Sequence, residues 1–323
     1  MFSLPSPQKI NKRIQSRNIG VIDLASEKYF DKKFAVSVRD MNLRVKPTEM
    51  PKYSPEGFDM NCETLCRRGE IMILLSEKPK NGFYLVHSVN TQGYAAEQDI
   101  AWISRGKAIE LINSDSFVCI TDKFVLTSPS RDENISKIPL SFGTKLPLMG
   151  ENSAAYSVLL PFRGDDGKVK TKTAEIPKSC TVSKGYLKFT RKNILQLSLR
   201  MRGMPYDWGE SFGGCDCSSL ICAAFSLCGV FLPRNSSKIA KISCKEVPFK
   251  KGKTAFLRCR PADIIVCKGH VMLYYGKYKG KNYVFHSFLG SRGITDITTA
   301  DEKTSAGVPF TDIAEKIISL RYI

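Results

Sequence analysis

The sequence predicts an α+β protein in which small all-β modules precede a domain of helices packed on an antiparallel sheet. Short alternating runs such as "IMILLSE", "GFYLVHSVN" and "AYSVLLPF" recur through residues 41–185, separated by Pro, Gly, Asn and Asp turns. From residue 186 onward, helical patterns come first and β-rich segments follow. Alternation with a period of two is typical of half-buried strands, and helices followed by strands are typical of α+β domains.

Residues 1–40 contain one short helical candidate, around "LASEKYFDKKFAVS", and we expect this lead-in to pack on another part of the chain. The ranges 41–108 and 109–185 each have room for one small β barrel, because their turn signals recur every 8 to 12 residues or so. "MNLRVKPTEMP" and "GFYLVHS" resemble the opening and the end of a bacterial SH3-like barrel. We therefore expect two SH3-like barrels before residue 186.

Residues 186–323 carry the clearest helical signals. "YLKFTRKNILQLSLRMRGM" has apolar residues at helical spacing and ends at Gly203 and Pro205. The glycine-rich loop "YDWGESFGGCD" leads into a second helix, "CSSLICAAFSLCG", and the β-rich segment "RPADIIVCKGHVMLYYGKYKGKNYVFHSF" comes later. This range is expected to form one α+β domain.

The chain has 323 residues and a formal net charge of +18. Such a charge attracts anionic ligands, although a solvated basic surface explains it equally well. Basic runs such as "EKPKNG" and "FKKGK" lie among Gly and Pro, and aromatic residues do not interleave with them, so we expect no nucleic-acid partner. No apolar run approaches the 18 or so residues of a membrane span.

The first residues, "MFSLPSPQKINKRIQSRNIG", contain basic residues but no apolar core of a secretory signal. We therefore expect a cytoplasmic protein, with the cell envelope or secretion as the alternative if a signal has been removed. Eleven dispersed cysteines, an odd number, favour reduced thiols over a disulfide framework. "CDC" lacks a second Cys or His pair at zinc spacing, so neither a metal nor an organic cofactor is expected.

Cys217 begins the second predicted helix, directly after "GGCD". A helix N-terminus presents unpaired N–H groups and a partial positive charge, which stabilise a thiolate and an oxyanion. A thiol also needs a base, and an imidazole steadied through its other nitrogen is a suitable one. His270 and His286 flank the hairpin "GKYKGKN", so a strand pair places them close together. We expect Cys217 as nucleophile, His270 as base and His286 as its orienting group.

Three other cysteines of this segment are considered as alternatives to Cys217. Cys215 is the rival nucleophile, but it belongs to the loop and should miss the first turn of the helix. Cys222 and Cys228 lie further along the helical pattern and are expected in the core. Cys217 is therefore the preferred candidate.

In this order, "YDWGESFGGCDCSSLICAAFSLCGVFLPRNSS", "RPADIIVCKGHVMLYYG" and "VFHS" resemble the NlpC/p60 family of cysteine peptidases, which has a papain-like fold. The resemblance covers roughly residues 200–290 and carries Cys217, His270 and His286 onto the family's catalytic triad. It also places four residues on the substrate side of the site: Tyr206, Asp216, Ser218 and Ser236. Two positions depart from the family pattern, Ser219 and Ala262, where the family usually has glycine.

Three of the residues in these motifs have alternative interpretations. Asp216 has two equally favoured interpretations: it caps the helix, or it binds a substrate amine. Arg234 likewise has two equally favoured interpretations: it braces the loop, or it contacts a ligand. Trp208 is expected to pack in the core beneath the loop rather than to contact substrate.

The resemblance implies a hydrolase that cleaves peptidoglycan stem peptides between γ-D-glutamate and a diamino acid, either diaminopimelate or lysine. In the branch with SH3-like domains it also implies that the first barrel overhangs the groove and favours short peptides with a free L-Ala amine. Glu70 and Tyr94 are the candidate contacts from that barrel. A monomer is expected. The alternatives are a non-catalytic wall-binding protein and an amidase or acyltransferase on the same fold.

Overall fold

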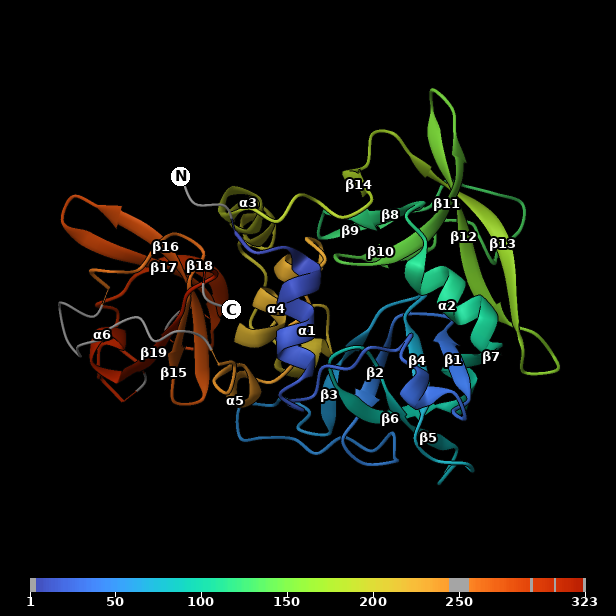
Figure 1. Cartoon of the computed structure of the whole chain (residues 1–323), viewed down its shortest axis with the longest axis horizontal. Coiled ribbons are helices and arrows are strands. Elements are labelled where there is room, and N and C mark those ends of the chain that lie inside the picture. Colours follow the sequence, from blue (N-terminus) through green and yellow to red (C-terminus); the bar gives the residue numbers. More distant parts are fainter. Residues whose placement is uncertain (1–3, 244–255, 291–292, 305, 322–323) are drawn as a thin grey trace. The chain divides into compact units, whose positions relative to one another are not determined.

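A computed structural model describes residues 4–243, 256–290, 293–304 and 306–321. Its contacts divide the chain into two compact units (Figure 1). One unit combines the N-terminal segment Met1–Val21 with Lys188–Ile323, and the other is Ile22–Leu187. The second unit is therefore an insertion between two parts of the first, and each is described below by itself.

The unit Ile22–Leu187 begins with a seven-stranded antiparallel sheet in the order β3-β2-β6-β5-β4-β1-β7. Its core contains buried side chains such as Leu43, Met72 and Ile100. The strands are β1 (Phe34–Ser37), β2 (Met41–Arg44), β3 (Cys62–Cys66), β4 (Ile71–Leu74), β5 (Phe83–His87), β6 (Gln92–Ala96) and β7 (Ile100–Ile103).

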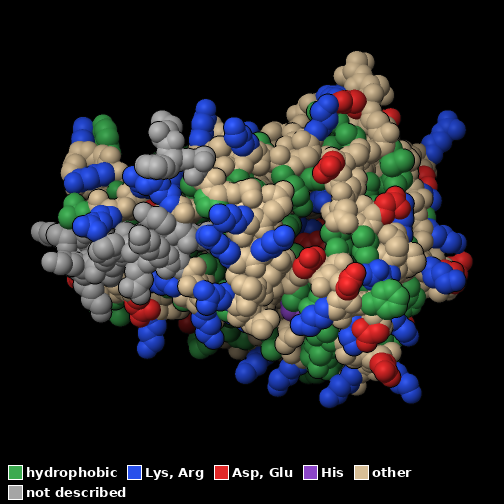
Figure 2. Space-filling view, in the orientation of Figure 1, with side chains coloured by type: hydrophobic (Ala, Val, Ile, Leu, Met, Phe, Trp, Pro, Cys, Tyr) green, Lys and Arg blue, Asp and Glu red, His purple; other side chains and the backbone are tan. Residues whose placement is uncertain are grey.

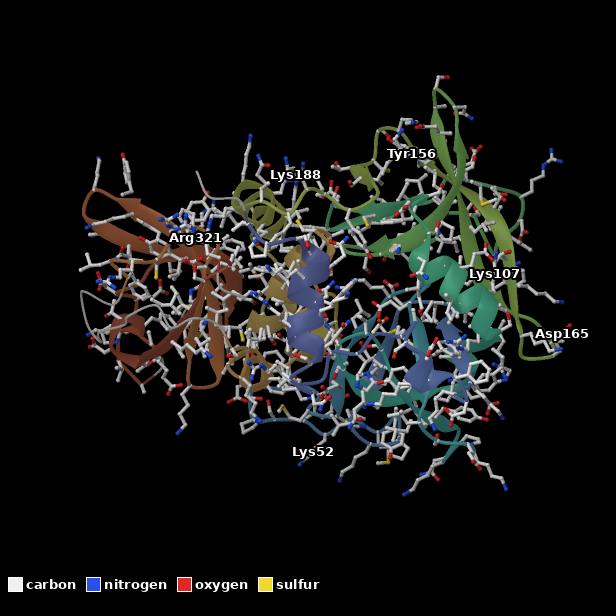
Figure 3. The ribbon with its side chains drawn as sticks, in the orientation of Figure 1. Lys52, Lys107, Tyr156, Asp165, Lys188 and Arg321 are labelled. Carbon is white, nitrogen blue, oxygen red and sulfur yellow. The ribbon has the colours of Figure 1, made fainter. Side chains whose placement is uncertain are left out.

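A second sheet follows in the same unit, in the order β13-β12-β11-β8-β14, with a separate pair formed by β9 and β10. Asp165 lies at the turn of its long β12–β13 hairpin (Figure 3). The strands are β8 (Phe117–Ile120), β9 (Phe124–Leu126), β10 (Pro139–Ser141), β11 (Lys145–Glu151), β12 (Ala155–Arg163), β13 (Val169–Pro177) and β14 (Val182–Lys184). The predicted antiparallel sheets are confirmed. The strand orders do not describe closed sheets, so the SH3-like barrels stay a prediction.

The other unit contains, among its described residues, an antiparallel sheet in the order β18-β17-β16-β15-β19. The helix α4 (Cys217–Ser226) packs against β16 and β17. The remaining elements are α3 (Arg191–Arg200), η3 (Trp208–Glu210), α5 (Ser236–Ile239), α6 (Phe310–Ile313), β15 (Ile264–Cys267), β16 (His270–Tyr278), β17 (Lys281–Phe288), β18 (Ile294–Thr299) and β19 (Ala314–Ile318). The predicted α+β order of this region is confirmed.

The N-terminal helix is not where the sequence pattern placed it. Helix α1 spans Pro7–Gln15, whereas the expected segment 24–37 forms only the turn η1 (Glu27–Tyr29) and strand β1. Ser6 accepts a hydrogen bond from the N–H of Lys9, Pro7 begins the helix, and Ile10 and Ile14 are buried one turn apart. Every side chain of "FAVS" is buried in β1, as is typical of a strand in a packed sheet.

A further helix, α2 (Arg105–Asn113), connects the two sheets of the inserted unit. Its N-cap is Ser104, whose hydroxyl accepts a hydrogen bond from the N–H of Lys107. The expected boundary between the two barrels at residue 108 lies inside this helix. The ranges 41–108 and 109–185 divide the segment "RGKAIELIN", which forms a single helix.

Lys and Arg side chains are spread over the visible face among Asp and Glu (Figure 2). The basic run "FKKGK", expected to be a loop, lies outside the described residues. Within the described part of the chain, every helix is too short or too polar to cross a membrane.

Candidate active site

Helix α4 begins at Cys217, and Asp216 is its N-cap. Asp216 Oδ1 accepts hydrogen bonds from the N–H groups of Ser218 and Ser219, at 3.0 and 2.8 Å. The Ser219 hydroxyl is 2.9 Å from the N–H of Asp216 and completes a capping box. Serine at position 219, where glycine was expected, therefore has a defined role in the helix start.

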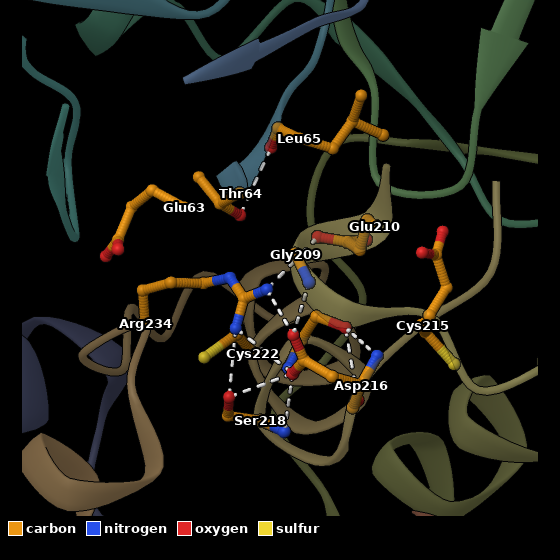
Figure 4. A network of polar contacts seen from close by, with 12 residues as sticks. Glu63, Thr64, Leu65, Gly209, Glu210, Cys215, Asp216, Ser218, Cys222 and Arg234 are labelled. Atoms are coloured by element: carbon orange, nitrogen blue, oxygen red, sulfur yellow. Dashed lines mark hydrogen bonds and ion pairs between the residues drawn. The ribbon is translucent and has the colours of Figure 1, made fainter. Parts of the chain in front are cut away.

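A buried ion pair holds the same carboxylate from the other side (Figure 4). Arg234 Nη2 lies 2.6 Å from Asp216 Oδ2, and its Nη1 donates to Asp216 Oδ1 and to the hydroxyl of Ser218. The N–H of Gly209 donates to Oδ2 as well. Arg234 and its hydrogen bonds outweigh burial and keep the pKa of Asp216 below its usual value. Both carboxylate oxygens are thus engaged in capping and bracing, so a substrate amine would have to share them.

Cys217 is 6% exposed at the first position of this helix. Burial, followed by the charge of Asp216, raises the pKa of its thiol to about 12. The backbone N–H of Val271, the residue after His270, hydrogen-bonds to the sulfur and acts in the opposite direction. Cys217 therefore lies against the start of β16, where His270 is located, and its resting state at neutral pH is the thiol.

His270 begins β16, and His286 lies on the neighbouring strand β17. His270 Nε2 and His286 Nδ1 are 2.9 Å apart, and His286 Nε2 is 2.9 Å from the hydroxyl oxygen of Thr298 on β18. The expectation that the hairpin brings the two imidazoles together is confirmed. Since Nε2 of His270 is used by His286, Nδ1 remains as the nitrogen that can receive a proton from a thiol.

Two phenylalanine rings enclose the histidine pair. Phe310 is centred 5.4 Å from the ring of His270 and 5.1 Å from that of His286, and Phe288 is centred 5.5 and 5.6 Å from them. Burial lowers the pKa of His270 well below 6.5 and that of His286 to about 4. Both imidazoles are therefore neutral at pH 7, so the site combines a neutral thiol with a neutral base.

Cys215, the rival nucleophile, is directed elsewhere. Its sulfur is 3.0 Å from the hydroxyl of Thr295, and its carbonyl accepts a 2.5 Å hydrogen bond from Ser287. Burial raises the pKa of its thiol to about 12. Cys222 and Cys228 are buried in the core, as predicted. The described cysteines are all free thiols, and Cys244 lies outside the described residues.

The other predicted substrate-side residues lie on the loop and helix starts around α4. Burial, together with the nearby Cys217, raises the pKa of Tyr206, which agrees with its expected place close to the nucleophile. Ser218 is occupied by Asp216 and Arg234, whereas Ser236 is a half-buried residue at the start of α5. Trp208 is 40% exposed, so the expected core packing is wrong. It opens the turn η3, where Gly209 has a φ of 67° and redirects the chain.

Ala262 retains the backbone shape that favours glycine. Its φ is 68°, in the left-handed region, and its N–H donates to the carbonyl of Tyr274 at 2.7 Å. An alanine here costs about 1 kcal/mol in strain, but the turn before β15 is preserved.

Glu70 and Tyr94 belong to the inserted unit and are described within it. Glu70 follows β3, where its Oε1 accepts the N–H of Arg67 at 3.0 Å and its Oε2 lies 3.4 Å from the sulfur of Cys66. Burial raises the pKa of this carboxyl group. Tyr94 is half-buried on β6, opposite Arg44 of β2. Their proposed contact with substrate stays a prediction.

Sequence reasoning missed Thr298, Phe288 and Phe310. Thr298 lies two positions after the residue paired with His286 in the β17–β18 register, a relation visible only once that register is known. Among the described residues, no cluster of three or more His, Cys, Asp or Glu side chains is suited to a metal ion.

Residues 203–305 match the model of the NlpC/P60 family, and this range contains Cys217, His270, His286 and Thr298. They form an NlpC/P60 domain. The chain is similar to a γ-D-glutamyl-L-lysine dipeptidyl-peptidase of Bacillus cereus, with 26% identity over 54% of this chain and 53% of the relative. The chain spans about half the length of such curated relatives.

Two solved structures share the fold. An NlpC/P60 endopeptidase from Photobacterium damselae subsp. piscicida aligns with a TM-score of 0.74 and 17% identity, over 98% of this chain and 78% of that one. An NlpC/P60 family protein from Bacillus cereus aligns with a TM-score of 0.69 and 17% identity, over 89% of this chain and 99% of that one. At this identity the likeness establishes the fold, in which the NlpC/P60 domain follows the β-rich region.

Proposed function

We propose that this protein is a cysteine peptidase that hydrolyses peptidoglycan stem peptides at the bond between γ-D-glutamate and a diamino acid. The observation that carries the proposal is the position of Cys217 at the start of α4, against the strand that begins with His270. The β-rich insertion is proposed to contain two SH3-like barrels. The proposed preference for a free L-Ala amine rests on the family resemblance.

The proposed cycle is an acyl transfer. Cys217 gives its proton to Nδ1 of His270 as its sulfur attacks the γ-glutamyl carbonyl carbon, and the backbone N–H of Cys217 at the start of α4 donates to the oxyanion. The imidazolium of His270 then donates that proton to the departing amine as the C–N bond breaks, which leaves a thioester. Water, deprotonated by His270, attacks the thioester and releases the γ-glutamyl carboxylate and the Cys217 thiol.

Buried, neutral groups suit this cycle because the proton moves only when the substrate arrives. A thiol with its pKa raised to about 12 is a weak nucleophile until an adjacent base removes its proton during the attack. His270, with its pKa lowered, is unprotonated at pH 7 and can act as that base.

Two features favour the proposed substrate. The curated relatives are named for the γ-D-glutamyl-L-lysine bond, and we extend that bond to this chain, with lysine or diaminopimelate as the diamino acid. The net charge of +18 suits a peptide whose glutamate and diamino acid carry carboxylates.

The test is hydrolysis of L-Ala-γ-D-Glu-L-Lys and of its diaminopimelate counterpart, followed by mass spectrometry of the products. We expect the intact chain to release the free diamino acid and L-Ala-γ-D-Glu. Cys217→Ala should lose at least ~10³-fold in kcat/KM, while Cys215→Ala, the matched control two residues away, should stay within about threefold of the wild type.

The competing outcomes are distinct. Binding of insoluble cell wall without release of product would support the non-catalytic module instead. Cleavage at a different amide would support the amidase alternative. Full turnover by Cys217→Ala would overturn the assignment of the nucleophile.

A further inference from the structure

Strand β18 places a hydroxyl group at the end of the histidine pair. His286 is paired with Asp296 in the β17–β18 register, and side chains two residues apart on a strand share a face. Thr298 therefore lies on the face of His286, and its hydroxyl oxygen is 2.9 Å from His286 Nε2. Thr298 is 8% exposed, so water does not readily replace it as a partner.

The chain from His270 through His286 to Thr298 has two possible proton arrangements. In the first, His270 Nε2–H donates to His286 Nδ1, and His286 Nε2–H donates to the Thr298 oxygen. In the second, Thr298 donates to His286 Nε2, and His286 Nδ1–H donates to His270 Nε2. Only the first leaves Nδ1 of His270 without a proton and able to receive the one from Cys217.

We propose that Thr298 is a positioning residue that fixes the productive tautomer of both histidines by accepting the hydrogen bond from His286 Nε2–H. This inference deepens the proposed function and rests on it for its kinetic consequence. In the productive arrangement His286 is an acceptor toward His270, so it also stabilises the imidazolium that forms when His270 takes the thiol proton. Thr298 thus acts on the base through His286 and touches neither substrate nor Cys217.

Several charged or titratable groups surround the histidine pair and are kept constant in the test. Asp296 on β18 is itself held by Arg202, whose Nε lies 2.6 Å from Oδ1 of Asp296. The carboxylate that acts on His270 is Asp216, at the start of α4, and the one that acts on His286 is Asp296, on β18. Cys267 of β15 is paired with His270 in the sheet register. Replacing Thr298 changes none of these charges.

The experiment compares Thr298→Val, which removes the hydroxyl and keeps the shape, with Thr298→Ser, which restores it. Thr299→Val is the matched control, because the next side chain along a strand points to the opposite face. We expect Thr298→Val to lower kcat roughly ten- to a hundredfold, as is common for groups that orient a reactive residue, with KM changed by less than about twofold. Thr298→Ser should recover kcat to within about threefold of the wild type, and Thr299→Val should leave it unchanged.

A second readout follows the protons directly. In ¹⁵N-histidine spectra of the intact protein, both His270 and His286 should carry their proton on Nε2, and Thr298→Val should give a mixture of tautomers. The chain has three histidines, and His87 lies in the inserted unit, so His87→Gln completes the assignment.

The inference is overturned if His286 of the wild type carries its proton on Nδ1, or if Thr298→Val retains wild-type kcat and spectra. A wild-type protein that cleaves no peptide would overturn the proposed function instead, and the spectra would still decide the role of Thr298.

Discussion

The two sides of Cys217 are built on opposite electrostatic principles. On the side of α4, Asp216 and Arg234 form a buried ion pair in which every carboxylate oxygen has donors. On the side of the sheet, His270 and His286 are neutral groups between phenylalanine rings. The charged side holds a loop and a helix in one geometry, while the neutral side is able to pass a proton. The comparison separates residues that fix the site from residues that react in it.

The largest expected effect is the loss of stability when the buried ion pair between Asp216 and Arg234 is broken. Arg234→Met leaves the buried carboxylate of Asp216 without its cation, and the loss of one partner of a buried pair costs about 3–5 kcal/mol of the free energy of unfolding. Urea unfolding followed by circular dichroism measures this loss. Arg202→Met is the matched control, because the side chain of Arg202 is 59% exposed beside Asp296 and such a pair contributes less than about 1 kcal/mol. Equal losses in the two variants would contradict the distinction.

An effect of intermediate size is the loss of stability at acid pH that results from protonation of the buried His286. The folded-state pKa of His286 is about 4, whereas an unfolded histidine titrates near 6.5, so below pH 6.5 the unfolded state binds the proton more strongly. Stability should fall by roughly 3 kcal/mol from this residue as the pH drops from 6.5 through about 4. Urea unfolding at pH 7.5 and pH 4.5 tests this, with His286→Gln as the comparison, since the carboxylates that also titrate there are common to both proteins. A variant that loses as much stability as the wild type would show that His286 is not the cause.

The smallest effect sharpens the role of the aromatic rings. Phe310→Leu admits water to the histidine pair, which favours the charged imidazole and raises its pKa toward 6.5. The acid limb of the pH dependence of kcat/KM should therefore move toward neutral pH by up to about one pH unit, so that activity at pH 5 falls more than at pH 8.

Phe256→Leu is the control for this change. Phe256 belongs to the same buried cluster as Phe310 but stacks on Tyr274, 6.0 Å away between ring centroids. It should alter stability without moving the acid limb. An equal shift in both variants would point to general loosening of the core.

The positions of the proposed nucleophile and its proposed base could be predicted from sequence because local rules place them. Cys217 follows a loop and opens a helix, and a hairpin necessarily brings residues of its two strands together, as it does His270 and His286. Thr298 could not be predicted, because threonine is common in strands and its partner depends on the register of β17 and β18. The saturation of Asp216 likewise depends on Arg234, which follows 18 residues later in a separate loop.

The prediction of a helix around residues 24–37 is wrong, and the helix of this N-terminal segment is Pro7–Gln15. Local signals for α1 were present in Ser6 and Pro7, but the partner of α1 is distant: the Asn11 side chain donates to the carbonyl of Gly229 and accepts from the N–H of Phe231. The capping signals of Ser6 and Pro7 locate the start of α1, but the surface on which it packs lies far along the chain and is not visible in the local pattern.

The two hydrogen bonds of Asn11 with Gly229 and Phe231 have a consequence for biosynthesis. Helix α1 is synthesised before its backbone partners, which lie 218 and 220 positions after Asn11. Residues 22–187 have their own contacts and can fold while translation continues, but the nascent N-terminal segment must wait until Phe231 has been added. The unit that contains Cys217 and His270 should therefore be completed only after the inserted unit has been synthesised.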